Sequence, residues 1–270
     1  MRIYAIFVYV FLYMPIAIIA LFSFSAGRSA SQLEGLSVKW YGRALNNPFV
    51  MDALGNSLFV AFVSATLASI LGTLAAVGLQ GIRGSARAIF DAIIYIAVMI
   101  PGIVIGIATL IALVTVFGVV NPWLAALWPT GFEPPSLSMG MGSLIAAHTM
   151  FTMALVIIIV RARLSGLEGV LFEASADLYA TPFGTFRQIT LPLIAPAVLA
   201  GFLLSFTFSF DDFIIAFFVA GSETTLPIYI FSSIRRGITP EVNAIGTMVM
   251  LASLMLLIIA QLILRRGDKR

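Results

Sequence analysis

Long apolar segments that hold almost no charge constrain this chain more than any other feature. Six of them follow one another along the sequence, at residues 4–24, 57–79, 92–119, 141–160, 193–219 and 243–264. A helix needs about 20 apolar residues to cross the hydrocarbon core of a bilayer, and each segment is close to that length or longer. The sequence therefore predicts an all-α integral membrane protein with about six transmembrane helices, built as one membrane domain over residues 1–270.

Composition narrows the class of protein further. Hydrophobic residues make up 61% of the chain and charged residues 10%, a balance that excludes an ordinary soluble domain. Cysteine is absent, so the chain forms neither disulfides nor thiolate metal sites. The net charge of +3 is small, and nothing in the sequence indicates nucleic-acid binding.

The positions of Lys and Arg predict the orientation in the membrane, because these residues are enriched in cytoplasmic loops. An even number of spans puts both termini on one side. With the termini inside, ten Lys and Arg residues lie inside and five outside, so we expect cytoplasmic termini and a cytoplasmic loop at 161–192. The inner residues are Arg2, Arg83, Arg87, Arg161, Arg163, Arg187, Arg265, Arg266, Lys269 and Arg270. The outer residues are Arg28, Lys39, Arg43, Arg235 and Arg236.

Two spans carry packing signals. Small residues recur at every fourth position of the second span, at Ser64, Ala68, Gly72 and Ala76. This spacing places them on one helical face, where small side chains let another membrane helix approach closely. Pro101-Gly102 interrupts the third span, which we expect to tilt or bend there. That interruption is either a structural kink or a part of a transport path.

Two polar stretches outside the spans predict further helices. Lys39, Trp40, Tyr41 and Arg43 form a basic and aromatic cluster that is typical of an interfacial helix at the level of the lipid headgroups, or that contacts a docking partner. Thr239-Pro240-Glu241 reads as a helix start, with Thr as the cap, Pro in the first turn and an acid at the positive end.

The loop at 161–192 predicts two short amphipathic helices joined by a turn. Its first segment presents one apolar face, and Thr181-Pro182 supplies a cap and a first-turn proline for the second. The two apolar faces consist of Val170, Leu171, Ala174 and Leu178, and of Phe183, Phe186 and Ile189. They pack either against the chain's own spans or into a groove of another protein.

The same loop resembles the EAA loop of the permeases of ABC importers. Glu173-Ala174-Ser175, Ile189 and Leu191-Pro192 agree with the spacing of that motif, whereas Tyr179 stands where the family has Gly. A left-handed helix end is costly for Tyr, so either the first helix runs on through Tyr179 or the turn is built differently. Other stretches are similar to the second membrane subunit of spermidine/putrescine importers. They are Asn56-Ser57-Leu58, Pro101-Gly102, Ser209-Phe210-Asp211-Asp212-Phe213, Leu226-Pro227 and Pro240-Glu241-Val242-Asn243-Ala244.

The resemblance implies a membrane subunit of an ATP-driven importer in the bacterial inner membrane. Its partners would be a dimer of ATP-binding subunits, a second homologous permease and an extracytoplasmic binding protein. ATP and Mg²⁺ would be bound by the partner subunit, and this chain would hold no cofactor and no catalytic residue. The residues that would couple the chain to the ATPase are Glu173, Ala174, Ser175, Asp177 and Leu178.

The expected function is import of a polyamine or a related small organic cation. Opines, amino-acid derivatives and phosphonates remain alternative substrates. A self-contained secondary transporter is a further alternative, but no internal repeat is evident. An intramembrane enzyme would need metal-assisted chemistry at Asp211 and Asp212, which diverge by about 100° on a helix and have no further carboxylates at helical spacing. No phosphate-binding loop and no metal-ligand cluster is present in the sequence.

The acidic pair in the fifth span is the candidate for a substrate pathway. Charged residues inside a span are costly and usually face a bundle interior or an aqueous cavity. Asp211 lies nineteen residues after Pro192, about 28 Å along a helix, which places the pair in the outer half of the span. We expect Asp211, Asp212, Phe210 and Phe213 to line the pathway, because aromatic rings also attract ammonium groups. Alternatively one Asp caps a broken helix or pairs with Arg235 or Arg236.

His148 is the only histidine of the chain and lies in an apolar span. The sequence favours a hydrogen-bonding group between helices over a catalyst.

Overall fold

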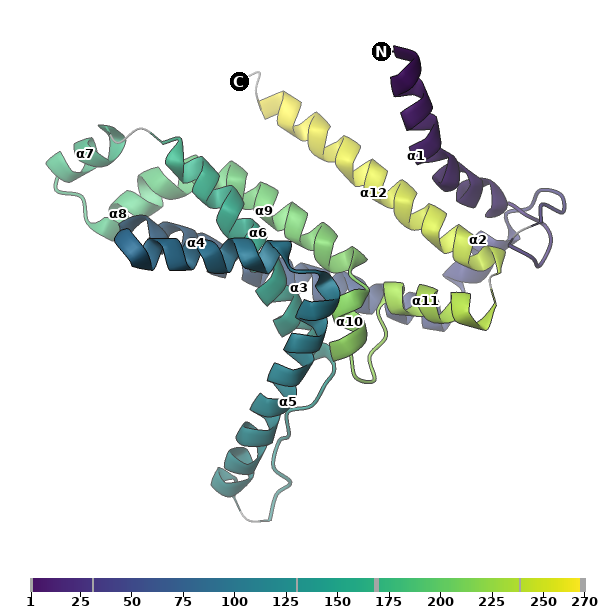
Figure 1. The fold of residues 1–270 in the computed structure, drawn as a ribbon, viewed down its shortest axis with the longest axis horizontal. Coiled ribbons are helices and arrows are strands. Elements are labelled where there is room, and N and C mark those ends of the chain that lie inside the picture. Colours follow the sequence, from purple (N-terminus) through teal and green to yellow (C-terminus); the bar gives the residue numbers. More distant parts are fainter. Residues whose placement is uncertain (1, 31, 130, 168–169, 238, 268–270) are drawn as a thin grey trace. The chain divides into compact units, whose positions relative to one another are not determined.

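The computed structural model describes residues 2–30, 32–129, 131–167, 170–237 and 239–267, and the described residues are mostly helical. Lys269 and Arg270, two of the inner basic residues, lie outside them. Figure 1 follows the elements in chain order. They are α1 (Arg2–Phe22), α2 (Lys39–Leu45), α3 (Pro48–Gly78), the 3₁₀-helix η1 (Leu79–Gly81), α4 (Gly84–Met99), α5 (Gly102–Leu127), α6 (Met141–Ser165), α7 (Val170–Asp177), α8 (Pro182–Thr185), the π-helix η2 (Phe186–Thr190), α9 (Leu191–Asp211), α10 (Ile214–Val219), α11 (Leu226–Arg236) and α12 (Pro240–Gly267).

Five helical segments in the described ranges are long and apolar enough to cross a bilayer. They are Tyr4–Phe22, Pro48–Gly81, Gly102–Leu127, Met141–Ser165 and Pro182–Asp211. The sixth expected span, at residues 243–264, lies within α12, whose apolar stretch Pro240–Met255 is shorter. The side chains beyond Met255 lie outside the described ones. The all-α membrane fold is therefore confirmed.

The helices divide into two compact units, residues 1–53 with 229–270 and residues 54–228. The single membrane domain expected from the sequence stays a prediction. In the first unit α12 packs against α1 and α2. Glu241, in the first turn of α12, accepts a hydrogen bond of 2.9 Å from Asn47 Nδ2 and lies 3.6 Å from Arg43 Nε. The predicted start of this helix at Pro240 is confirmed.

The aromatic and basic cluster of the first unit forms the helix α2, as predicted. Trp40 is buried, and its Nε1 donates a hydrogen bond of 2.9 Å to the Ser25 carbonyl. The cationic groups of Lys39 and Arg43 lie over the Trp40 ring, 5.1 and 5.4 Å from its centroid. Trp40 thus stabilises the unit from inside, and the location of α2 at a membrane surface stays a prediction.

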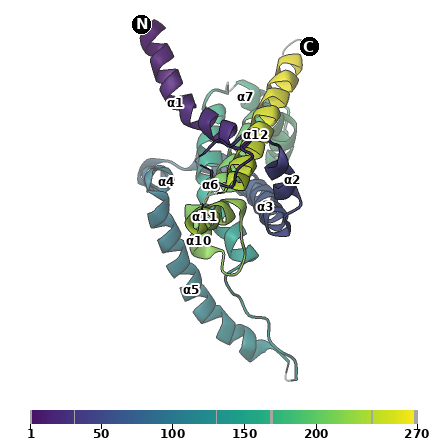
Figure 2. The ribbon, with the colours of Figure 1, turned by 90° about the vertical axis from the view of Figure 1, so that its right-hand side faces the viewer.

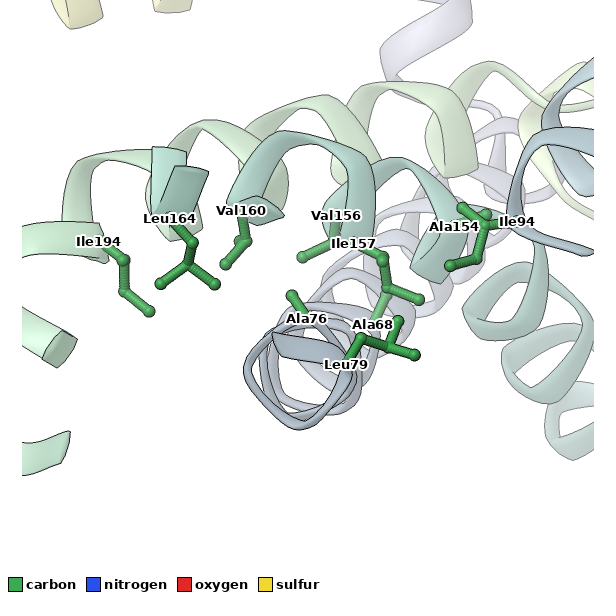
Figure 3. Packing of buried hydrophobic residues seen from close by; sticks show 10 residues of the cluster. All are labelled: Ala68, Ala76, Leu79, Ile94, Ala154, Val156, Ile157, Val160, Leu164 and Ile194. Atoms are coloured by element: carbon green, nitrogen blue, oxygen red, sulfur yellow. The ribbon is translucent and has the colours of Figure 1, made fainter. Parts of the chain in front are cut away.

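The second unit has a core between α3, α6 and α9. Figure 3 shows Ala68 and Ala76 of α3 among Val156, Val160 and other apolar side chains, and all four are fully buried. A Cβ atom on Gly72 would lie 2.9 Å from the Cβ of Val156, closer than real Cβ contacts come. The small-residue face predicted for α3 is therefore confirmed as the contact surface for α6.

The prediction that the third span is one continuous helix is wrong. Ile100 and Pro101 take extended backbone angles, so the segment at 92–119 breaks into α4 and α5 instead of bending within one helix. A proline disfavours helical geometry in the residue before it and cannot donate to the preceding turn, and here both effects end α4 at Met99. In Figures 1 and 2 α5 runs away from α4 at a steep angle. At its start α5 packs against α10, where a Cβ on Gly106 would lie 2.7 Å from the Phe218 ring.

Candidate functional site

The fifth span is interrupted at its acidic pair. The prediction of one continuous helix over 193–219 is wrong, because α9 ends at Asp211 and α10 begins at Ile214. Asp212 takes an extended conformation, with φ −70° and ψ 121°. Its Oδ2 atom accepts a hydrogen bond of 2.9 Å from the backbone N–H of Ala216, in the first turn of α10. An acid that accepts from the free amides of a helix start stabilises that start, so Asp212 favours the break.

A cavity of about 530 Å³ lies beside this break. Its lining residues come from α6, α9, α10 and the break itself, and they are Phe151, Thr207, Phe208, Asp211, Asp212, Phe213 and Ile214. Three of the four residues predicted for the pathway therefore meet at one cavity. The fourth, Phe210, is absent from the lining and stacks on Phe206, with ring centroids 6.2 Å apart.

The two carboxylates have different surroundings. Asp212 is held by the α10 amide and has a side chain that is 15% exposed. Asp211 has no hydrogen bond or ion pair with any residue that the structure describes, and it is the more exposed of the two. The alternative pairing of this site with Arg235 or Arg236 is absent from the described ion pairs. One acid thus serves the helix break and the other faces the cavity unpaired.

A buried polar chain lies behind the cavity. His148 Nδ1 is 2.7 Å from Ser209 Oγ, and Ser209 Oγ is 2.9 Å from Ser64 Oγ. These contacts join α6, α9 and α3, so the interpretation of His148 as a group that bonds between helices is confirmed. The sequence did not indicate that His148 also approaches the acidic pair, with Nε2 3.5 Å from Asp212 Oδ2. The sequence singled out Ser64 only as the first member of the small-residue face, and nothing in the sequence linked it to His148.

The loop at 161–192 contains the two predicted short helices. Thr181 caps α8, because its hydroxyl accepts a hydrogen bond of 3.1 Å from the Gly184 amide. The second helix does not end within the loop: it continues through η2 into α9 as one segment from Pro182 to Asp211. Pro192 lacks an amide proton, and the wider π-helical turn at 186–190 precedes it, a place where such turns accommodate a missing backbone bond. The span therefore begins at Pro182, eleven residues before its predicted start at 193.

The first short helix ends in a left-handed residue, as the family's glycine would. Tyr179 has φ 54°, the one positive φ outside glycine among the described residues. The Tyr179 amide bonds to Ala176 O at 2.9 Å and the Ala180 amide to Ser175 O at 3.1 Å. These two bonds form a Schellman motif. Both expected geometries are therefore wrong: the helix does not run on through Tyr179, and the turn is the left-handed one that a glycine would form.

The residues expected to couple the chain to an ATPase lie together on and after α7. Leu178 is 81% exposed and Tyr179 95% exposed, and both follow a helix whose Glu173, Ala174 and Asp177 are also exposed. Ser175 differs, because it is buried and its Oγ lies 2.6 Å from Thr185 Oγ1. It ties α7 to α8 and is the one member of the predicted set that holds the loop together. Across the described residues no group of three His, Asp or Glu side chains is placed to hold a metal ion.

Comparison with known proteins agrees with this architecture. Residues 68–270 match the family described as binding-protein-dependent transport system inner membrane component. The chain is 37% identical over 262 residues to the spermidine/putrescine transport system permease protein PotC of Haemophilus influenzae, covering 97% of this chain and 95% of the relative. It is 36% identical over 266 residues to the putrescine transport system permease protein PotI of Escherichia coli, covering 97% and 89%.

A solved structure shares the fold at low identity. A bacterial ABC transporter involved in the import of the acidic polysaccharide alginate contains a chain with a TM-score of 0.74 and 16% identity, covering 97% of this chain and 92% of that one. The family match, the identity to two permeases over nearly the whole chain and the shared fold all point the same way. This chain belongs to the family of inner membrane components of binding-protein-dependent transport systems.

Proposed function

We propose that this chain is the permease subunit of an ATP-driven importer that carries a polyamine, such as spermidine or putrescine, or a related small organic cation. The observation that carries the proposal is the carboxylate of Asp211, which has no partner among the described residues and lies in a cavity that three phenylalanines also line. The relatives named above, two permeases of polyamine transport systems, support the same substrate class. Opines, amino-acid derivatives and phosphonates are the alternative substrates.

The chemistry of the cavity suits an ammonium group better than an anion. An acid inside a membrane span is costly unless it meets a cation, a donor or water. Phe151, Phe208 and Phe213 line the same cavity, and the faces of aromatic rings attract ammonium groups. A polyamine alternates ammonium groups with methylene chains, so one carboxylate and several rings match its two kinds of surface. A phosphonate would meet two carboxylates and would be repelled.

We further propose a complete importer around this chain. Two ATP-binding subunits would hold ATP and Mg²⁺, and one of them would receive α7 in a cleft. A second, homologous permease would complete the membrane pathway, and a binding protein would deliver the substrate from outside. The termini and the α7 loop would lie in the cytoplasm. In this arrangement the chain itself catalyses no reaction.

The test of substrate class is uptake of radiolabelled spermidine by cells that lack their own polyamine importers and express the complete system. We expect saturable uptake that unlabelled putrescine inhibits. Asp211→Asn should raise the KM by about tenfold or more, because a hydrogen bond to a charged group contributes about 1.5–3 kcal/mol. Glu133→Gln, which alters an exposed carboxylate outside the cavity lining, is the matched control and should leave uptake unchanged. Uptake that a phosphonate inhibits and spermidine does not would overturn the proposal.

The test of coupling uses Glu173→Ala and Ala174→Trp on the exposed face of α7. Both variants should reach the membrane and assemble, yet lose uptake or hydrolyse ATP without transport. Normal uptake by both would remove the proposed role of α7.

A further inference from the structure

His148 is the most completely enclosed ionisable side chain near the cavity. It lies on α6 and is 2% exposed, and its ring reaches α9 through Ser209 and, by way of Ser209, Ser64 on α3. Both of its ring nitrogens therefore lie away from bulk water. A buried polar atom without a partner is costly, so the surroundings of each nitrogen decide what the residue does.

The two nitrogens have unequal partners. Nδ1 lies 2.7 Å from Ser209 Oγ, a full hydrogen bond. Nε2 is buried without a hydrogen-bond partner among the described residues, and the nearest charged atom is Asp212 Oδ2 at 3.5 Å. Either Nδ1 or Ser209 Oγ can donate in their contact, and a carboxylate oxygen accepts, so a proton on Nε2 is the one that would meet Asp212. In this arrangement Nε2 lies behind the part of the cavity wall that Asp212 forms.

We propose that His148 is a positioning residue of the transport site: through its Nε2–H it holds the Asp212 carboxylate at the α9–α10 break, without touching the substrate. The inference rests on the proposed function, since it takes the cavity at Asp211 and Asp212 as the place where a small organic cation passes. It adds a residue that lies behind the cavity and outside its lining.

The arrangement gives His148 a role that packing alone would not. Asp212 Oδ2 accepts the Ala216 amide from one side and faces His148 Nε2 from the other. With both contacts the carboxylate stays at the break and Asp211 remains the free acid. Without Nε2–H, one donor remains, and the Asp212 side chain turns toward the cavity or toward Asp211. We expect two carboxylates that approach each other to change the affinity of the cavity for a cation, and so the KM, more than the maximal transport rate.

Replacing His148 by asparagine or by glutamine tests its contacts with Ser209 and with Asp212 separately. On a helix the Asn amide lies near the place of Nδ1 and the Gln amide near that of Nε2. His148→Gln therefore retains a donor for Asp212, and His148→Asn retains only the Ser209 contact. The neighbouring buried Thr149, whose hydroxyl also lacks a partner among the described residues, supplies the control Thr149→Val.

The experiment measures spermidine uptake and thermal midpoint for the complete importer reconstituted in lipid vesicles. We expect His148→Asn to raise the KM about tenfold with a maximal rate within about twofold, and His148→Gln and Thr149→Val to stay within about threefold of the wild-type KM. In the Asp212→Asn background, His148→Asn should add no further change in KM. Equal defects in His148→Gln and His148→Asn, or additive effects with Asp212→Asn, would overturn the positioning role.

The thermal midpoints separate this inference from the proposed function. If the wild-type importer does not carry spermidine, the polyamine proposal fails. The thermal midpoints of the wild type, His148→Asn, Asp212→Asn and the double variant still report the contact between the two side chains. Non-additive shifts support this contact, and additive shifts overturn it.

Discussion

Replacing Gly72 by alanine tests the packing of the second unit at its tightest point. The added Cβ would lie 2.9 Å from the Cβ and 3.0 Å from the Cγ1 of Val156, and 3.2 Å from the Met153 carbonyl. Val156 is fully buried on α6, and its Cβ is fixed close to the backbone, so the helices themselves must separate. Overpacking of this kind costs about 1–3 kcal/mol.

Helix propensity opposes that cost and has to be removed from the measurement. Alanine is favoured over glycine inside a helix by about 1 kcal/mol. Gly55 lies on the same helix, and a Cβ there meets nothing within 4 Å. Gly55→Ala therefore reports propensity alone. The difference between the Gly72 and Gly55 variants isolates the clash, about 1–3 kcal/mol, or about 2–12 °C in thermal midpoint at 2–4 °C per kcal/mol.

The assay is the thermal midpoint of the assembled importer, measured by intrinsic fluorescence in the same detergent for each variant. Val156→Ala removes Cγ1 and should partly rescue Gly72→Ala, so that the double variant loses less than the two single losses together. If Gly72→Ala and Gly55→Ala shift the midpoint equally, the close approach of α3 and α6 at this point is refuted.

Three further predictions concern other parts of the chain. Tyr179→Gly should relieve about 1–2 kcal/mol of left-handed strain and slow hydrogen exchange at the Ala180 amide; unchanged or faster exchange would contradict it. Glu241→Ala should lower the thermal midpoint by about 2–12 °C, because it removes about 1–3 kcal/mol of hydrogen bonding in the first unit, and a midpoint equal to wild type would argue against that contact. Reporter fusions should score inside at Ser175 and outside at Ser222; an outside score at Ser175 would contradict the orientation and the coupling role of α7.

The fold was predictable from the sequence wherever composition, or the spacing of one residue type along the chain, determines the structure. Apolar length alone located the spans, because a bilayer imposes a minimum that few other structures share. The four-residue spacing of Ala68, Gly72 and Ala76 located the packing face of α3, since small residues at this spacing have little other use in lipid. The Thr181-Pro182 pair marked a helix start because both residues suit the first turn.

Helix interruptions were predicted poorly, for a physical reason. Pro101 signalled a disturbance, yet its size depends on whether neighbouring helices can satisfy the freed backbone groups, which a single sequence does not reveal. The π-helical turn at 186–190 left no mark in composition at all. The break at Asp212 has neither proline nor glycine beside it, and the sequence offered only the alternative that one acid caps a broken helix.

That alternative explains why two adjacent acids are tolerated in one apolar span. On a continuous helix both carboxylates would point from the surface of the span, about 100° apart, with no free backbone donor in reach. Once the helix breaks, the first amides of α10 become available, and Asp212 accepts one of them at 2.9 Å while His148 Nε2 lies 3.5 Å from the same oxygen. The break thus gives Asp212 a partner within the protein and leaves Asp211 without one among the residues that the structure describes. In the proposed function the cation that enters the cavity stabilises this carboxylate, so the structural cost of the site and the proposed selectivity for a cation have the same physical origin.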